Sequence, residues 1–491
     1  MSGGRQPTLP IKIDSTSNGE YRPIPLDRSL AAANAAAAER LTENARRLGL
    51  DRRQFLSGMC GAATTLLTFN AAFAAKGVRG GSFALPPEAA FEDAVAQAAL
   101  GSRDFIFDVQ THMVDPNGPW RQRPGAAGGW SSFLSSLPQG RCGKSDPVDC
   151  FAADPFIKEV FLDSDTDMAV LSFVPALPEY NPLTLGEAAR TRELVAQLGG
   201  GRRLLLHAMV VPNVADPAAQ LAAMERAAAE WKISAWKVYT QWGPAREGWW
   251  LDDPKVGIPF IEKARALGIK TIAIHKGLSF GGFPLKYAGC ADVGRVAKLF
   301  PDVTFLIYHA GYEARRGEGP YDPSAGADVG IDTLVASLKA NGIPPNANVY
   351  AELGSTWRIL MRDPTAAAHA LGKLLTHVGH DRVLWGTDSI WYGSPQDQIQ
   401  AFRAFQIAPE FQEKYGYPAL DAALKAKVFG LNAASVYGVD PASIIRKAGV
   451  DDLDRARAAY REQPAPSFAT YGPRTTAEFD TLVKRRGAAP P

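Results

Sequence analysis

Four short apolar runs in this chain each end in a histidine or an aspartate. The first spans residues 105–112 and ends in His112, and the other three end at His275, His309 and Asp388. Runs of β-branched and aromatic residues are typical of buried strands, and the C-terminal ends of the strands of a parallel barrel meet on one face. The pattern therefore predicts that three imidazoles and a carboxylate from separate segments converge on one site.

This combination of residue types indicates a metal site. Nitrogen and oxygen ligands on separate rigid elements, with one position left for water, are what a mononuclear metal enzyme needs. A single histidine after an apolar run is more often structural, but three of the seven histidines of this chain occupy predicted strand ends. His207 lies inside an apolar run and is a weaker candidate. The remaining three, His369, His377 and His380, fall in a predicted helix or loop and are interpreted as structural or solvated.

Predicted strands and helices alternate through most of the chain, which favours an α/β fold of the distorted (β/α)8 TIM-barrel class. A length of 491 residues with 46% hydrophobic content accommodates such a barrel, which needs about 250 residues, together with extensions. The expected strands are residues 104–112, 167–174, 203–211, 233–239, 270–275, 304–309, 348–353 and 382–388. The expected helices that separate them include residues 187–198, 217–230, 258–267, 291–300, 331–340 and 365–378.

Two function classes are disfavoured. No phosphate-binding glycine motif opens a helix after a strand, so nucleotide binding is not expected. The net charge of +2 gives no electrostatic reason to expect nucleic acid as a partner.

The region before the barrel contains an export-like sequence. Arg52 and Arg53 precede a moderately apolar stretch, and residues 72–74 form a small-x-small triplet, in the order found in twin-arginine signals. We therefore expect export to the periplasm or the extracellular space by the twin-arginine machinery, with cleavage near Ala75. The alternative is an N-terminal helix of the folded protein, whereas polar interruptions argue against a transmembrane helix. The expected organisation is a disordered or helical extension (1–50), a signal-like segment (51–75), a lead-in helix (76–103), the barrel (104–445) and a C-terminal tail with helical character (446–491).

A long segment rich in Gly, Pro and Ser, residues 113–154, follows the first predicted strand. Loops of this length in a compact domain are usually functional lids or insertions. Cys142 and Cys150 lie within it and either form a disulfide that pins the lid or remain two free thiols; the sequence leaves both alternatives open.

The strand-end residues resemble the amidohydrolase superfamily, and more narrowly the amidohydrolase-related group that includes aromatic-acid decarboxylases and lactonases. The resemblance is carried by Asp-Val-Gln-Thr-His at 108–112, by His275 and His309, and by Leu-Trp-Gly-Thr-Asp at 384–388. Residues 430–438 are similar to the closing helix of that group. The resemblance implies a distorted barrel that holds one divalent metal, with zinc expected first and manganese or iron as alternatives.

The resemblance also implies roles for single residues. His112, His275 and Asp388 would hold the metal, Asp388 would also act as the general base, and His309 would be the polarising or acid–base imidazole. The chain departs from the family pattern at Gln110, where the first histidine of a His-x-His pair is expected. A glutamine oxygen is a weaker zinc ligand than imidazole, so the sequence predicts a lower metal affinity.

Substrate binding is predicted for Lys237 and Trp236, which lie on the predicted strand at 233–239, and for Arg315 and Trp391, which follow later predicted strands. Lys237 stands near the position where binuclear relatives have a carboxylated lysine, but the preferred interpretation is a lysine that reaches into the barrel mouth. Aromatic side chains commonly line ligand pockets and arginines clamp carboxylates, although the tryptophans could simply cover the mouth and the arginine could be solvated.

These features together predict a metal-dependent hydrolase of a small cyclic or aromatic organic acid, ester, lactone or amide. Two alternatives remain: a metal-dependent decarboxylase of an aromatic acid, and a catalytically weakened barrel that binds a ligand without turnover, which Gln110 motivates. The expected partners are a small-molecule substrate and the export machinery, and the sequence leaves a homo-oligomer open.

Overall fold

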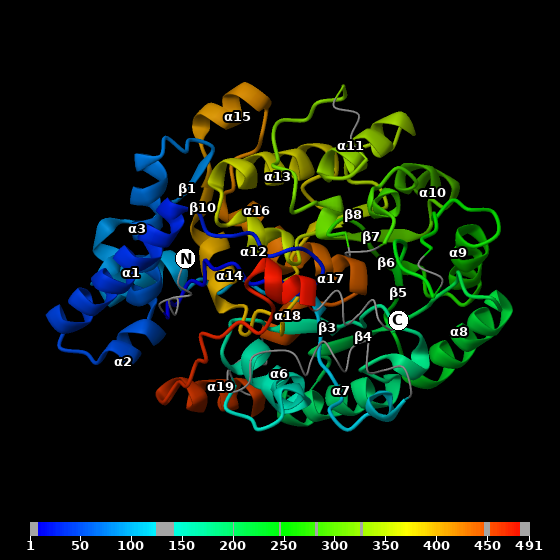
Figure 1. Ribbon diagram of the computed structural model, residues 1–491, viewed down its shortest axis with the longest axis horizontal. Helices are drawn as coiled ribbons and strands as arrows, with labels where there is room; N and C mark the ends of the chain where they lie inside the picture. Colours follow the sequence, from blue (N-terminus) through cyan, green and yellow to red (C-terminus); the bar gives the residue numbers. More distant parts are fainter. Residues whose placement is uncertain are drawn as a thin grey trace.

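The computed structural model describes residues 8–123, 142–199, 201–244, 247–279, 283–324, 328–445 and 452–481. Its centre is an eight-stranded parallel sheet surrounded by helices (Figure 1). The strands are β2 (Phe107–Thr111), β3 (Met168–Leu171), β4 (Leu204–Met209), β5 (Ala235–Tyr239), β6 (Thr271–His275), β7 (Thr304–Tyr308), β8 (Val349–Glu352) and β9 (Val383–Leu384).

The sheet nearly closes on itself. Its strands follow one another in chain order from β2 to β9, each parallel to the next. Backbone hydrogen bonds from Val109 N to Trp385 O (3.0 Å) and from Asp388 N to Gln110 O (2.9 Å) then join the segment after β9 to β2. The predicted (β/α)8 barrel is confirmed.

Both faces of each strand are buried, which explains the continuous apolar runs in the sequence. On β6, Ala273 packs inside the barrel with Leu306 of β7, while Ile272 and Ile274 belong to the layer between strands and helices. Because a parallel strand is covered on both faces, its sequence does not alternate between apolar and polar residues.

The outer helices match the predicted ones within a few residues. Asp216 caps α8 by accepting a hydrogen bond from Ala219 N, and Asp363 caps α13 by accepting from Thr365 N and Ala366 N. Each of these helices therefore begins directly after an aspartate that satisfies its free backbone N–H groups. The outer layer comprises α7 (Leu185–Gly199), α8 (Pro217–Trp231), α9 (Gly257–Ala266), α10 (Val293–Leu299), α11 (Ile331–Ala340), α13 (Pro364–His377) and α14 (Gln396–Ala404). Shorter helices are α6 (Ala153–Ile157), α12 (Thr356–Leu360), α15 (Pro409–Tyr415), α16 (Ala422–Ala426), α17 (Asn432–Tyr437), α18 (Pro441–Ile445) and α19 (Asp452–Glu462).

The helices that precede the barrel pack against one side of it, at the left of Figure 1. They are α1 (Arg28–Arg47), α2 (Arg52–Ser57), α3 (Met59–Ala75) and α4 (Asp93–Leu100), and a small antiparallel ladder of β1 (Gly81–Phe83) with β10 (Phe405–Ile407) joins this region to the C-terminal half. In α3, Leu66 and Phe69 are fully buried, whereas Arg52 and Arg53 are exposed. The structure therefore shows the signal-like segment as folded helices, while export and cleavage remain predictions. Among the described helices, none has the length and apolar character needed to span a membrane.

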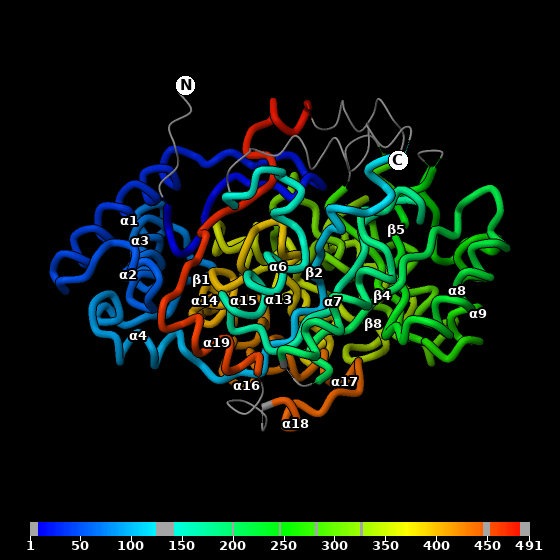
Figure 2. The backbone as a smooth tube through the Cα atoms, turned by 90° about the horizontal axis from the view of Figure 1, so that it is seen from below, coloured from blue at the N-terminus to red at the C-terminus, as the bar shows by residue number. Residues whose placement is uncertain are grey.

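Residues 8–27, here named the N-terminal strap, are an ordered extended segment, whereas the sequence predicted a disordered or helical extension. Ile11 and Ile13 are buried, and the strap runs beside the C-terminal segment, as Figure 2 shows. Ser17 N donates to Pro473 O at 2.9 Å, and the hydroxyls of Thr16 and Thr470 lie 2.8 Å apart. Polar contacts therefore join the N-terminal strap to the segment around residues 470–473, and these contacts cannot be predicted from the local sequence.

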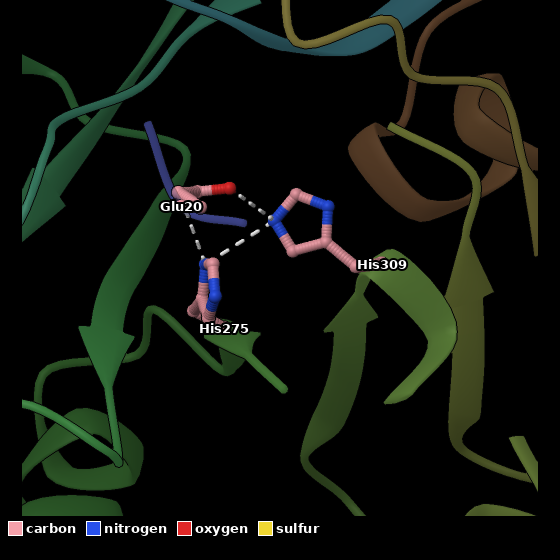
Figure 3. A group of neighbouring side chains, drawn as sticks. All are labelled: Glu20, His275 and His309. Atoms are coloured by element: carbon pink, nitrogen blue, oxygen red, sulfur yellow. Dashed lines mark hydrogen bonds and ion pairs between the residues drawn. The ribbon is translucent and has the colours of Figure 1, made fainter. Parts of the chain in front are cut away.

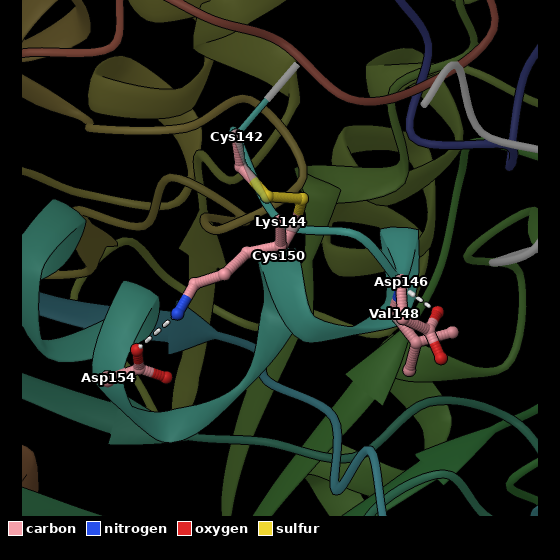
Figure 4. Close-up of a disulfide and its surroundings, with 6 residues drawn as sticks. All are labelled: Cys142, Lys144, Asp146, Val148, Cys150 and Asp154. Atoms are coloured by element: carbon pink, nitrogen blue, oxygen red, sulfur yellow. Dashed lines mark hydrogen bonds and ion pairs between the residues drawn. A yellow bond between two sulfur atoms is a disulfide. The ribbon is translucent and has the colours of Figure 1, made fainter. Parts of the chain in front are cut away.

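Cys142 and Cys150 form a disulfide, with Cα atoms 5.7 Å apart (Figure 4). This decides between the two alternatives that the sequence leaves open for the lid. Phe151, next to the bridge, is buried, and the bridged turn is pinned further by an ion pair between Lys144 and Asp154 at 3.0 Å. The part of the lid at 124–141 lies outside the described residues.

Candidate metal centre and active site

The predicted strand ends meet in one buried cluster. His112 Nε2 lies 3.1 Å from Asp388 Oδ1, and Gln110 Nε2 lies 3.2 Å from the same oxygen. His309 Nε2 lies 3.2 Å from His275 Nδ1 and 3.4 Å from Gln110 Nε2. Each of these five residues is at most 2% exposed. The structure thus brings together all of the residues predicted to hold the metal, including Gln110.

The turns that carry three of the polar groups have unusual backbone geometry. His309, Ser355 and Asp388 all have positive φ angles, of 62°, 53° and 59°. Non-glycine residues rarely adopt this left-handed conformation, and such strain is concentrated at functional sites. The surrounding contacts must therefore hold these side chains in place.

Two residues of the N-terminal strap, Asn18 and Glu20, enter the cluster and were not predicted. Asn18 Nδ2 donates to Asp388 Oδ2 at 2.7 Å. Glu20 Oε1 lies 3.6 Å from His275 Nδ1, and Glu20 Oε2 lies 3.8 Å from His309 Nε2, as Figure 3 shows.

One sequence signal could have located the strap. Leu9, Ile11 and Ile13 alternate with polar residues or proline, and all three are buried. Period-two alternation is the pattern of an extended segment with one buried face.

The donor set fits a divalent metal ion. Ligand atoms of Glu20, His275 and His309 all lie within 4.8 Å of one another. His112 Nδ1 is 3.2 Å from the Ser172 carbonyl oxygen and therefore donates to it, so its Nε2 faces the Asp388 carboxylate with either a proton or a metal ion between them. Imidazoles whose second nitrogen donates to a backbone carbonyl are typical of metal ligands.

Asp388 is an anion at neutral pH. Burial alone would raise the pKa of its carboxyl group, but the hydrogen bond and charge of His112, together with His309 and Ser355, outweigh burial and lower it. Burial also lowers the pKa of His309 to about 4, so its imidazole is neutral. The cluster thus pairs an ionised carboxylate with a neutral imidazole, as a general base needs.

Two further buried acids, Glu352 and Asp108, support the turns. Burial raises the pKa of Glu352 to about 8 and the pKa of Asp108 to about 7. Glu352 accepts from His309 N at 3.1 Å, and Asp108 accepts from Thr387 N at 3.1 Å, next to Asp388. They hold the backbone at and next to His309 and Asp388, and sequence analysis did not single them out.

Lys237 lies inside the barrel. Its Nζ is 3.6 Å from the centre of the Tyr308 ring and 4.6 Å from that of Tyr239. Within the described part of the chain, this Nζ has no hydrogen-bond partner. Burial lowers the pKa of Lys237 to about 7, against the opposing influence of the Glu20 and Glu352 carboxylates. A buried ammonium of this kind can bind an anionic group of a substrate.

The other predicted substrate residues divide into two groups. Trp391 stacks on His112, with ring centres 5.9 Å apart, and packs on Phe151 of the lid at 5.2 Å. Trp236 points the other way and lines a hollow between β5 and α8. The exposed side chain of Arg315 bonds Glu313 at 3.3 Å and Ser279 Oγ at 3.1 Å. The structure therefore brings Trp391, but neither Trp236 nor Arg315, into contact with the cluster.

Among similar solved structures is a 2,6-dihydroxybenzoate decarboxylase from Rhizobium, which is 15% identical and aligns over 68% of this chain and 99% of its own, with a TM-score of 0.38. A 4-oxalomesaconate hydratase from Rhodopseudomonas palustris is 18% identical and aligns over 74% of this chain and 100% of its own, with a TM-score of 0.43. An uncharacterized TIM-barrel protein from Bordetella bronchiseptica is 13% identical and aligns over 68% of this chain and 98% of its own, with a TM-score of 0.40. No curated protein sequence matches the chain.

The family model described as "Amidohydrolase" matches residues 181–439, more than half of the 491 residues. The matched range contains His275, His309 and Asp388 and excludes Gln110 and His112, which the structure adds to the same cluster. With its eight-stranded parallel barrel and this family match, the chain belongs to the amidohydrolase family.

Proposed function

We propose that the protein is a metal-dependent hydrolase of a small cyclic or aromatic organic acid, ester, lactone or amide. The observation that carries the proposal is Asp388, an ionised carboxylate at 1% exposure whose Oδ1 faces His112 and whose neighbour His309 is neutral. A buried anionic base beside a set of metal-ligand side chains is suited to activating water.

His112, His275 and Asp388 would hold one divalent metal, for which zinc is the first expectation and manganese or iron the alternatives. When bound, the metal supplies Lewis-acid activation of water near neutral pH. Asp388 accepts the proton of the attacking water and returns it to the leaving group. His309 Nδ1 donates to Gly354 O at 2.6 Å, so its Nε2 carries a lone pair that accepts a hydrogen bond and orients the water or substrate.

Lys237 is proposed to bind the anionic group of the substrate. Its buried ammonium faces two aromatic rings, an arrangement that stabilises the charge only partly. A carboxylate would replace the missing hydrogen bonds, which favours an organic acid or a compound that opens to one.

Decarboxylation is the second candidate reaction, and Lys237 also supports it. A carboxylate held by a buried ammonium could leave as carbon dioxide, provided that Asp388 or His309 then delivered a proton to the carbanion. The neutral state of His309 and the lowered pKa of Asp388 favour proton acceptance over donation, so hydrolysis remains the first proposal.

Product analysis of the metal-loaded protein distinguishes the alternatives. The protein would be screened against aromatic acids, esters, lactones and amides in ¹⁸O-labelled water and in deuterium oxide. Incorporation of ¹⁸O without release of carbon dioxide supports the hydrolase. Carbon dioxide release with deuterium at the vacated carbon supports the decarboxylase, and ligand binding without turnover supports the weakened barrel.

Asp388→Asn is the matched test of mechanism. It keeps the shape of the side chain and removes the base, so kcat is expected to fall by about 10²- to 10⁴-fold, the usual contribution of general acid–base catalysis. Asp328→Asn, at an exposed loop position, is the control and should retain the wild-type kcat. Equal kcat values for the two variants would contradict the role of Asp388.

We also propose that the protein is exported through the twin-arginine machinery. The proposal is supported by the exposed arginine pair, Arg52 and Arg53, at the start of α2. Cleavage near Ala75 would remove the N-terminal strap and with it Asn18 and Glu20, so the intact mass of the exported protein decides whether the strap stays with the enzyme.

A further inference from the structure

We infer that Glu20 of the N-terminal strap is an anionic ligand of the metal together with His275 and His309, so that His309 Nε2 would bind the ion itself rather than orient the water. The inference rests on the proposed metal-dependent function and adds a ligand from outside the barrel. It is carried by the protonation pattern of the two imidazoles, by the distances among the donor atoms, and by the neutral side chain at Gln110.

The backbone fixes which nitrogen of each imidazole carries the hydrogen. His309 Nδ1 is 2.6 Å from the carbonyl oxygen of Gly354, and His275 Nε2 is 3.4 Å from that of Leu278. Carbonyl oxygens only accept hydrogen bonds, so these two nitrogens donate. In neutral rings the lone pairs then lie on His309 Nε2 and His275 Nδ1.

These two lone pairs face each other and the Glu20 carboxylate. The nitrogens are 3.2 Å apart, and the carboxylate oxygens lie 3.6 Å from His275 Nδ1 and 3.8 Å from His309 Nε2 (Figure 3). Two imidazole nitrogens and a carboxylate gathered at such distances are suited to share one cation. Donors that bind zinc tetrahedrally with bonds of 2.0–2.1 Å are about 3.4 Å apart, which these separations match.

Glu20 also supplies charge that the barrel lacks. Gln110 is neutral, its Nε2 donates to Asp388 Oδ1 at 3.2 Å, and its Oε1 has no hydrogen-bond partner among the described residues. Asp388 Oδ2 accepts from Asn18 at 2.7 Å and from Ser355 at 2.5 Å. Asp388 supplies one negative charge to the cluster, and the Glu20 carboxylate adds a second, which matches the charge of a divalent ion.

The strap holds Glu20 in a defined position. Gly19 has a φ of 88°, and its N donates to Ser17 Oγ at 2.9 Å. Glu20 N donates to Asn18 Oδ1 at 3.0 Å, and Asn18 Nδ2 donates to Glu20 Oε2 at 2.7 Å. The turn therefore presents the carboxylate before any metal binds, which reduces the entropy cost of binding.

Zinc affinity of the full chain tests the inference. Dissociation constants would be measured by competition with a chromophoric chelator, on protein whose intact mass confirms that residue 20 is present. Glu20→Gln is expected to raise the zinc Kd by about 10-fold or more, since even the outer partners of metal ligands change affinity by 10- to 100-fold. Glu39→Gln, an exposed carboxylate on α1, is the matched control and should leave the Kd unchanged.

Two further variants keep the outcomes distinct. Glu20→Asp retains the charge on a shorter side chain, so it should bind zinc with intermediate affinity and shift the visible bands of the cobalt-substituted protein. If Glu20→Gln and Glu20→Asp both match the control while His275→Ala loses the metal, Glu20 is not a ligand and the proposed function stands. If His275→Ala also retains wild-type affinity, the metal site itself is wrong.

Discussion

Replacement of Lys237 by methionine tests how strongly the barrel interior disfavours the ammonium charge. The pKa of Lys237 is lowered from 10.5 to about 7, primarily by burial. Methionine has a similar length and no charge, so it keeps most of the packing against Tyr308 and Tyr239. We expect Lys237→Met to stabilise the fold while weakening the binding of an anionic substrate.

The magnitude follows from proton linkage. A decrease of about 3.5 pKa units corresponds to about 5 kcal/mol of unfavourable free energy, taken as an upper limit. Between pH 7 and 10.5 the unfolded chain binds more protons at this site than the folded one, so wild-type stability rises with pH there. The free energy of unfolding of Lys237→Met should therefore exceed that of the wild type by about 5 kcal/mol at pH 6. This difference should decrease by about 1.4 kcal/mol per pH unit above pH 7.

The assay is urea unfolding of chelator-treated wild type, Lys237→Met and the control Lys255→Met, at pH 6.0, 7.5 and 9.0. Lys255 is exposed, so its replacement should change stability little and with no pH trend. If the difference in free energy of unfolding between wild type and Lys237→Met does not vary with pH, the pKa of Lys237 is not lowered in the fold. A variant that is destabilised at pH 6 would show that the ammonium has a favourable partner in the fold.

The remaining predictions concern the cysteines, export and the glutamine at position 110. Alkylation of the unfolded, unreduced protein should label Cys60 and Cys290 if the chain keeps its N-terminus, and Cys290 alone if it is cleaved near residue 75; labelling of the lid cysteines would contradict the disulfide. Conversion of both Arg52 and Arg53 to lysine should retain the precursor inside the cell, and unchanged export would contradict the signal. Gln110→His should lower the zinc Kd because imidazole is the better donor, and an unchanged value would show that position 110 does not reach the metal.

The barrel and the histidine–aspartate cluster could be predicted because their signals are local. An apolar run followed by His275 or His309 specifies both a buried strand and the end at which its polar group lies. Parallel strand order then brings these ends to one face. The prediction for Trp236 overlooked the alternation of side chains along a strand, because Trp236 and Lys237 are neighbours and cannot both face the barrel interior.

The strap could not be predicted in the same way because distant contacts hold it. Asp14 forms an ion pair with Arg358 at 2.8 Å, and Ser17 bonds the backbone of Pro473. Apart from the alternation at Leu9, Ile11 and Ile13, the polar residues and prolines of the strap give it the composition of a disordered tail, and partners far along the chain hold it in place. The same holds for Glu20, whose role depends on residues more than 250 positions away.

The pairing of the strap with the C-terminal segment sets the order in which the active site is assembled. Arg474 Nε donates to Thr16 Oγ1 across a sequence separation of 458 residues, so this contact waits until almost the whole chain has been synthesised. Contacts of such long range also form late in folding, because they close the largest loops. The barrel can therefore bring His112, His275 and Asp388 together while the two chain ends are still undocked. Docking of the strap then brings Asn18 and Glu20 to this cluster, so the full set of polar side chains is present only after the two distant segments have met.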